Sequence, residues 1–202
     1  MELRVTRLYG VSLLFGGHFC IIALHMMGLR WQGKGGLGMR LFIAIQLSKG
    51  MREAIGALQD SLYAQGVRGN YTPRENLHLT LAFIGEYSDP DYVLEIVRSV
   101  PLAPFEMRLE GVGAFGDLWW IGLERSEALQ SFVRKLRHAL AEAGIPFDRK
   151  RFTPHITLLR RASADASGLR GIAVEPAEMI VDHPSLMRSD RGKNGMIYRE
   201  IE

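Results

Sequence analysis

The chain has 202 residues, of which 47% are hydrophobic, and this provides enough apolar side chains for one substantial core. The composition therefore excludes an intrinsically disordered chain and a small protein held together by disulfides. The net charge of +3 lies entirely in residues 1–38, so the rest of the chain is neutral and does not fit a protein that coats nucleic acid through bulk positive charge.

Residues 11–29 form an apolar run that is followed by a glycine-rich stretch at 33–38. Such a run is compatible with a signal peptide or a membrane anchor, but its glycines and two histidines weaken a spanning helix. We favour an N-terminal extension, residues 1–38, that is not part of the folded domain at 39–202. The extension holds the only cysteine, Cys20, so the domain has no thiol for a disulfide or a metal site. We expect a cytoplasmic protein, unless the apolar run is a targeting segment.

The first half of the domain is predicted to alternate strands with helices. Residues 39–45 have the apolar character of a strand, and Ser48 can cap a helix whose apolar residues recur every three or four positions up to Gly66. Residues 77–85 alternate in character as a strand does. An Asp-Pro pair at 89–90 then begins a second helix with an N-cap and a proline at its first position.

The second half is predicted to be richer in strands. Two strands, 105–115 and 118–124, flank a short hairpin loop, and a third helix follows at 127–143. The remaining segments are predicted as strands at 154–160, 177–187 and 196–201, a loop at 162–171 and a turn at 189–195. Mixed strands and helices with hairpins predict an α+β fold built largely of antiparallel sheet.

Two of the predicted strands carry the same motif, a histidine followed two residues later by a threonine. The side chains of a strand alternate between its faces, so His78 and Thr80 share one face, and so do His155 and Thr157. A single histidine in a strand is most often a structural residue. The repetition instead favours two equivalent lobes whose polar strand faces meet at one site.

This pair of motifs suits an in-line displacement at phosphorus, in which one group takes a proton from the attacking oxygen and another protonates the leaving oxygen. The ordinary pKa of histidine, near 6.5, allows either role at neutral pH. Threonine hydroxyls can donate to the other phosphate oxygens. A metal site is not favoured, because no Asp, Glu or Cys completes a compact ligand set with the histidines, and no Gly-x-Ser-x-Gly segment supports a serine nucleophile.

Phe83 and Arg160 each lie five residues after a motif histidine. Strict alternation places both on the opposite face of their strands, so Phe83 is expected in the core, and only a bulge or the end of a strand would turn Arg160 toward the histidines. Phe83 could alternatively offer an aromatic surface to a base. Arg160 belongs to a basic group around the second motif that comprises Arg149, Lys150, Arg151, Arg160 and Arg161.

The segments around the motifs, 75–85 and 152–160, resemble the 2H phosphoesterases, a family named for its two His-x-Thr motifs. Within that family they are similar to the bacterial and archaeal RNA 2′,3′-cyclic phosphodiesterases, once called 2′-5′ RNA ligases. Residues 39–44 and 186–190 resemble the first strand and a C-terminal strand of the family. The resemblance covers nearly all of the domain and has no counterpart for the N-terminal extension.

The resemblance implies an α+β fold with two pseudo-symmetric lobes, each an antiparallel sheet with helices on the outside, around a central cleft. It implies that RNA ending in a 2′,3′-cyclic phosphate is opened to a 2′-phosphate without a metal or another cofactor, with 2′-5′ ligation as a further reaction. It implies that Thr80 and Thr157 contact phosphate and that Phe83 and Arg160 flank the nucleobase. A monomer without a stable protein partner is expected.

The two histidines are predicted to have different roles. Basic residues surround His155 in the sequence, whereas the charges near His78 are balanced, so we expect His155 to be the neutral general base and His78 the proton donor. Two alternatives for the function stay open. One is hydrolysis of another small cyclic phosphate or of a 2′-5′ oligonucleotide by the same residues, and the other is a non-catalytic module that binds RNA ends.

Overall fold

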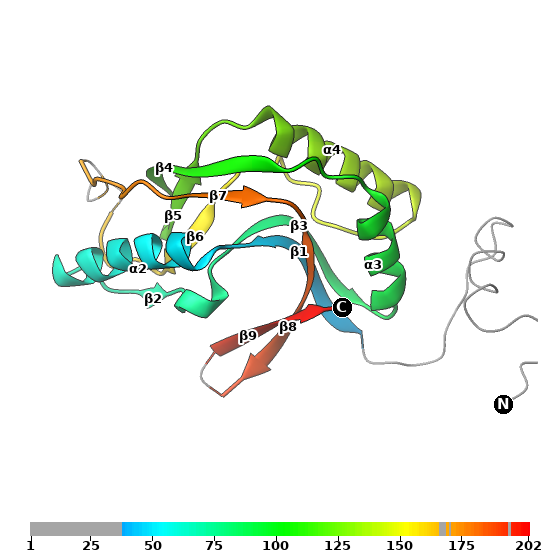
Figure 1. Ribbon diagram of the computed structural model, residues 1–202. Coiled ribbons are helices and arrows are strands. Elements are labelled where there is room, and N and C mark those ends of the chain that lie inside the picture. Colours follow the sequence, from blue (N-terminus) through cyan, green and yellow to red (C-terminus); the bar gives the residue numbers. More distant parts are fainter. Residues whose placement is uncertain (1–37, 166–168, 170, 194) are drawn as a thin grey trace, which may run out of the picture. The chain divides into compact units, whose positions relative to one another are not determined.

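The computed structural model describes residues 38–165, 169, 171–193 and 195–202, which belong to one compact α+β unit (Figure 1). The predictions for the N-terminal extension and its apolar run therefore lie outside the described residues, apart from Gly38. The described helices are α2 (Lys49–Ala64), η1 (Arg74–Asn76), α3 (Pro90–Ser99) and α4 (Glu127–Glu142). The described strands are β1 (Met39–Gln46), β2 (Asn70–Tyr71), β3 (His78–Tyr87), β4 (Phe105–Phe115), β5 (Leu118–Leu123), β6 (Ile156–Arg160), β7 (Glu178–Val181), β8 (Ser185–Gly192) and β9 (Gly195–Ile201).

The strands form two antiparallel sheets, each with its own helices. The four-stranded sheet has the order β3-β1-β8-β9, and the five-stranded sheet has the order β2-β6-β5-β4-β7. Helices α3 and α4 contact β8 and β3 of the first sheet, and α2 contacts β7 of the second (Figure 1). The prediction of an α+β fold with two antiparallel sheets and helices packed against them is confirmed.

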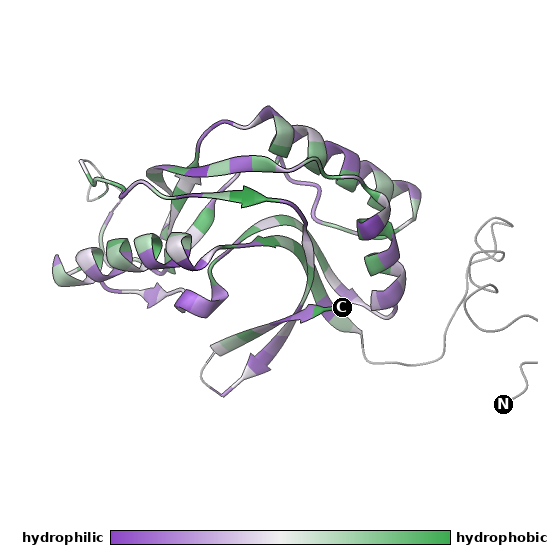
Figure 2. Ribbon diagram, in the orientation of Figure 1, coloured by the Kyte–Doolittle hydropathy of each residue, from purple (hydrophilic) through white to green (hydrophobic). Residues whose placement is uncertain are grey.

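Each of the three α-helices begins at a residue that its sequence supplies as a cap. Ser48 Oγ accepts the backbone N–H of Met51 at 3.2 Å, and the side chains of Asp89 and Ser126 cap α3 and α4 in the same way. Pro90 occupies the first turn of α3, where a missing N–H costs nothing. Hydrophilic and hydrophobic residues mix along these helices, as expected for helices with one buried side (Figure 2). In the described part of the chain, no helix has both the length and the hydropathy needed to cross a membrane.

Strand β1 separates two groups of apolar side chains. Leu41 and Ile43 belong to a large core that includes residues of both sheets and of the three α-helices. Phe42 points to the other side of β1 and belongs to a small cluster with Met187. Cross-strand neighbours share a face, and Phe42 pairs with Phe83, so this second side of the sheet also carries part of the first motif strand.

Two predictions for the C-terminal part are wrong. Residues 177–187 do not form one strand, because the chain leaves the five-stranded sheet after Val181 and enters the four-stranded sheet at Ser185. Pro184 lies at this crossing and lacks the N–H that a continuous ladder would need. The predicted turn at 189–195 is also too long, because β8 continues to Gly192. Its polar residues alternate within a hairpin instead of forming a loop.

Candidate active site

The first motif lies at the start of β3, where His78 is held by two hydrogen bonds. Its Nδ1 lies 2.7 Å from the backbone carbonyl of Asn76, and its Nε2 lies 3.0 Å from Thr80 Oγ1. A carbonyl can only accept, so Nδ1 carries a hydrogen and Nε2 is the nitrogen free to gain or lose a proton. Asn76 is itself buried, and its side-chain amide donates to the carbonyl of Met196 at 2.7 Å. These successive hydrogen bonds, from His78 to Asn76 and from Asn76 to Met196, fix the imidazole relative to β9.

The second motif repeats this arrangement at the start of β6. His155 Nδ1 lies 2.7 Å from the carbonyl of Thr153, again two residues before the histidine. The same argument leaves Nε2 of His155 as the nitrogen available for proton transfer. Thr157 lies one residue into β6 and pairs with Trp120 of β5. Each motif therefore presents one imidazole nitrogen and one hydroxyl on the same face of its strand.

Both motif strands contain a β-bulge directly after the threonine. In β3 the pairing with β1 jumps from Thr80 to Ala82, and in β6 the pairing with β5 jumps from Thr157 to Leu159. The extra residues are Leu81 and Leu158, and each of them is buried together with the residue that follows it. A bulge of one residue reverses the alternation beyond it. The residues just beyond the extra leucine, Phe83 in β3 and Arg160 in β6, are thus turned to the other face, and a second register shift between Phe83 and Gly85 reverses the alternation again in the rest of β3.

The bulges turn Phe83 and Arg160 onto the faces that carry the histidines. Phe83 is 36% exposed, so the expectation from spacing alone that it belongs to the core is wrong. Arg160 is exposed at the end of β6, and its charge acts on His78 of the other motif. The guanidinium of Arg40 lies 5.0 Å from the centre of the Phe83 ring. Phe83 therefore offers an exposed aromatic surface beside a cation.

Charge effects connect the two motifs. The pKa of His78 lies below its ordinary value because burial disfavours the charged imidazolium, while the carbonyl of Asn76 acts in the opposite direction. Positive charge on Arg160 and on His155 lowers the pKa of His78 further. Strands β3 and β6 also contact each other, although they belong to different sheets. The structure thus places His155 and Arg160 near enough to act on His78, and each histidine shares its strand face with the threonine of its motif.

Each histidine also lies against two aromatic rings from other strands of its own sheet, which sequence reasoning missed. The ring of Tyr198 is perpendicular to that of His78 at 5.2 Å between centroids, and Phe42 lies at 4.9 Å. Phe115 is perpendicular to His155, also at 5.2 Å. Phe42 lies between two core residues of β1, so alternation alone could have placed its ring on the face opposite the core. The contacts of the other rings with the histidines depend on how the strands pair.

Trp120 is the second aromatic neighbour of His155, with 6.3 Å between the ring centroids. Adjacent residues of a strand point to opposite faces, and the structure places Trp119 in the core and Trp120 on the motif side of β5. Gly113 pairs with Trp120, and a Cβ at Gly113 would collide with the indole. This glycine lets the indole lie flat over β4.

The basic residues that surround the second motif in the sequence contact different partners in the structure. Lys150 forms an ion pair with Asp148 at 3.5 Å, and the guanidinium of Arg149 lies 5.5 Å from the centre of the Phe147 ring. Arg161 follows the last residue of β6 and has a left-handed backbone, at a φ of 55°. Within residues 38–165, 169, 171–193 and 195–202, no three His, Cys, Asp or Glu side chains gather as metal ligands would.

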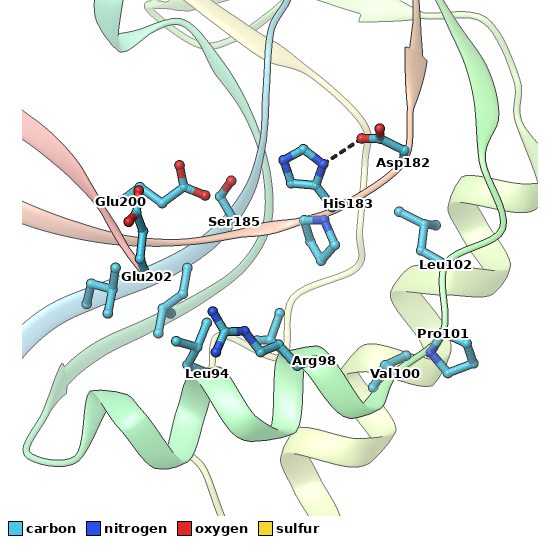
Figure 3. Close-up of a pocket in the computed structure, with 14 residues that line it drawn as sticks. Leu94, Arg98, Val100, Pro101, Leu102, Asp182, His183, Ser185, Glu200 and Glu202 are labelled. Carbon is cyan, nitrogen blue, oxygen red and sulfur yellow. Dashed lines mark hydrogen bonds and ion pairs between the residues drawn. The ribbon is translucent and has the colours of Figure 1, made fainter.

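A cavity of about 390 Å³ lies apart from the two motifs, between α3 and the end of β9 (Figure 3). It includes Arg98, Glu200 and His183, whose Nδ1 lies 2.5 Å from Asp182 Oδ1. None of the residues predicted for the site lines this cavity. His183 is exposed and paired, as expected for a solvated histidine.

Comparisons with known proteins agree with this geometry. The RNA 2′,3′-cyclic phosphodiesterase of Thermus thermophilus is 33% identical, with 81% of this chain and 88% of that protein covered. The enzyme of the same name from Thermotoga maritima is 28% identical, with 81% and 93% covered. Among solved structures, Escherichia coli LigT in its apo form matches with a TM-score of 0.70 and 27% identity, covering 83% of this chain and 96% of LigT.

The family model that matches is that of the 2′-5′ RNA ligase superfamily, over residues 47–193. This range contains both motif strands, both bulges and most of the residues that surround the histidines. The match thus covers well over half of the chain and the whole candidate site except Arg40, Phe42 and the part of β9 that includes Tyr198. The chain therefore belongs to the 2′-5′ RNA ligase superfamily, which the resemblance of its two His-x-Thr motifs had predicted.

Proposed function

We propose that the protein opens 2′,3′-cyclic phosphate ends of RNA to 2′-phosphates, with His78 and His155 as the acid and base. The observation that carries this proposal is the repeated geometry of two histidines that are each anchored through Nδ1 and of which one acts electrostatically on the other. Several relatives are named RNA 2′,3′-cyclic phosphodiesterase, which supports this substrate class. Joining of RNA ends through a 2′-5′ bond is a second reaction that the superfamily name supports.

In the proposed reaction, His155 Nε2 accepts a proton from water as the water oxygen forms a bond to phosphorus. The bond between phosphorus and O3′ breaks on the opposite side, and His78 Nε2 donates a proton to O3′. The hydroxyls of Thr80 and Thr157 donate to the phosphate oxygens that take no part in bond exchange. The products are a 2′-phosphate and a free 3′-hydroxyl. No metal is required by this scheme.

The pKa of His78 sets a condition on its role as donor. Burial lowers this pKa in the free protein, so His78 is mostly neutral near pH 7, whereas a donor must carry a proton. An anionic phosphate next to the imidazole has the opposite effect and raises the pKa. We therefore propose that binding of the anionic substrate raises the pKa of His78, so that the imidazole becomes protonated in the complex. The exchanged assignment, with His78 as base, is the alternative that the lowered pKa favours.

Phe83 and Arg160 are proposed to bind the terminal nucleotide. Phe83 is exposed on the side of β3 that carries His78, and aromatic rings of this kind stack on bases without regard to sequence. Arg160 supplies a positive charge that acts at the same site. LigT has been crystallised with 3′-AMP and with phosphate, ligands that would occupy such a nucleotide site.

The proposed function is tested by incubating the purified chain, in the presence of a chelator, with an RNA that ends in a 2′,3′-cyclic phosphate. We expect quantitative conversion to a 2′-phosphate, which is distinguished from the substrate by its sensitivity to a phosphomonoesterase and from a 3′-phosphate by its resistance to an enzyme that needs a 2′-hydroxyl at that ribose. Formation of a 3′-phosphate would contradict the proposed direction of ring opening. Tight binding without any product would favour the non-catalytic RNA-end module, and activity lost in chelator but restored by a divalent metal would contradict metal independence.

The pH dependence of kcat/KM follows from the lowered pKa of His78. With His78 as donor, the active form exists below this pKa, so kcat/KM should fall as the pH rises through a value below about 6.5. This high-pH limb should be absent in His78→Ala. If His78→Ala instead loses the low-pH limb, His78 is the base.

A substrate with sulfur in place of O3′ separates the two roles directly, because a thiolate leaves without needing a proton. We expect His78→Ala to regain most of its rate on this substrate and His155→Ala to stay slow. The reverse pattern would exchange the roles of the two histidines. Rates are compared with those on the oxygen substrate at the same pH.

A further inference from the structure

The extra leucines of the two bulges share an unusual feature, because each backbone carbonyl is bound by a side chain from a helix. A bulge leaves its extra residue outside the regular ladder, so its carbonyl needs another donor. The carbonyl of Leu158 accepts from Gln59 of α2, whose Nε2 lies 2.8 Å from the oxygen, in addition to the backbone N–H of Thr72, which follows β2. The carbonyl of Leu81 accepts from Arg137 of α4, whose Nε and Nη2 lie 3.2 and 3.0 Å from the oxygen.

The same two side chains also bind the segments that lead into the opposite motif. Gln59 Nε2 lies 2.9 Å from the carbonyl of Thr72, which precedes His78 in the chain. Arg137 Nη1 donates to the carbonyl of Lys150 at 2.8 Å, and Lys150 precedes His155. Each helix side chain is therefore hydrogen-bonded both to the bulge of one motif and to the segment that precedes the histidine of the other. The two links are reciprocal.

Backbone contacts reinforce both links. The N–H of Thr72 donates to the carbonyl of Leu158 at 2.9 Å, and the N–H of Asp148 donates to the carbonyl of Phe83 at 2.8 Å. Gln59 is 6% exposed, so its amide gives up hydrogen bonds to water in exchange for these carbonyls. Arg137 is half-buried beside the ring of Phe152, with 5.4 Å between the guanidinium and the ring centre. Both side chains are held in single orientations.

We propose that Gln59 and Arg137 form a cross-brace that sets the position of each His-x-Thr motif relative to the other. In-line displacement needs the base on one side of the phosphorus and the acid on the other, so the rate depends on this relative position. Neither side chain is among the groups that would contact the phosphate. They are positioning residues, and this inference rests on the proposed function for its kinetic readout only.

The experiment replaces each brace residue by an unbranched side chain of similar length, in Gln59→Met and Arg137→Met. Matched controls are Gln65→Met and Arg134→Met, exposed positions of the same types at the end of α2 and within α4. We expect kcat to fall roughly 10- to 100-fold in each brace variant while KM changes little, because about 1 Å of displacement can cost 10² in rate. The controls should keep the wild-type kcat.

The double variant Gln59→Met/Arg137→Met gives a sharper readout. If both residues fix one relative position, the second substitution should cost much less in kcat than it does alone, whereas losses in the free energy of unfolding should add. Arg137→Lys serves if the methionine variant does not fold. It keeps the charge but cannot reach both carbonyls with a planar fork, so kcat should still fall.

Imidazole NMR resonances of His78 and His155 separate failure of this inference from failure of the proposed function. Loss of either brace residue should shift the resonances of both histidines, including that of the motif whose bulge it does not bind. Shifts that are confined to one motif, or wild-type kcat in folded brace variants, would overturn the cross-brace. A wild-type protein without turnover would instead overturn the proposed function, and the resonances would still test the brace.

Discussion

Replacing either motif histidine by alanine should reduce kcat by roughly 10²–10⁴-fold, because each variant removes one half of the proton transfer. Both imidazoles lie on a strand face beside other polar groups, and their removal takes no side chain out of the large core. We therefore expect His78→Ala and His155→Ala to unfold at temperatures close to that of the wild type. The measurement is single-turnover kinetics on an RNA with a 2′,3′-cyclic phosphate.

His138→Ala is the matched control for these variants. His138 is exposed on α4, where its Nε2 lies 3.3 Å from Glu142. It has no role in the proposed reaction. Its replacement should leave kcat unchanged. A folded His78→Ala or His155→Ala protein with a rate near that of the wild type would refute the two-histidine mechanism.

The second large effect is expected from the motif threonines. Thr80→Val and Thr157→Val keep the branched shape of the side chain and remove only the hydroxyl, so each should lower kcat by on the order of 10²-fold, as loss of one oxyanion donor does. Thr80→Ser and Thr157→Ser keep the hydroxyl and should retain most of the rate. Thr80 has a further role, since its hydroxyl lies 3.0 Å from His78 Nε2.

The pH profile distinguishes the two threonines. Thr80→Val should move the limb that belongs to His78, because it removes a partner of that imidazole, whereas Thr157→Val should leave this limb in place. Equal and full activity in both valine variants would mean that the phosphate binds elsewhere. Binding of a non-hydrolysable phosphate analogue provides an independent check on the same proteins.

The parts of the site that could be predicted from the sequence are those that depend on local alternation. His78 and Thr80 lie two positions apart in one strand, and so do His155 and Thr157, so each pair shares a face whatever the rest of the fold does. The repetition of the motif further indicated that the two pairs act together, and the charge effects at His78 agree with this.

The parts that could not be predicted depend on pairing between distant segments. Nothing in the local sequence of Leu81 shows that β1 skips this residue, so Phe83 was expected in the core. The role of Gln59 was equally hidden, because α2 follows a strand of one sheet and binds a bulge in the other. The run at 177–187 has apolar residues near both of its ends, at 179–181 and 186–187, and nothing in the local sequence shows that these two parts belong to different sheets.

The place of β8 in the four-stranded sheet has a consequence for synthesis of the protein. β8 lies directly beside β1, so Gln46 and Ser185, which are hydrogen-bonded at 3.0 Å, are 139 residues apart in the chain. Until β8 and β9 have been synthesised, β1 has an open edge and His78 lacks Tyr198. A ribosome makes the chain from its N-terminus, so β1 and His78 are synthesised long before β8 and β9. The nascent chain therefore cannot complete this site before β9 has left the ribosome.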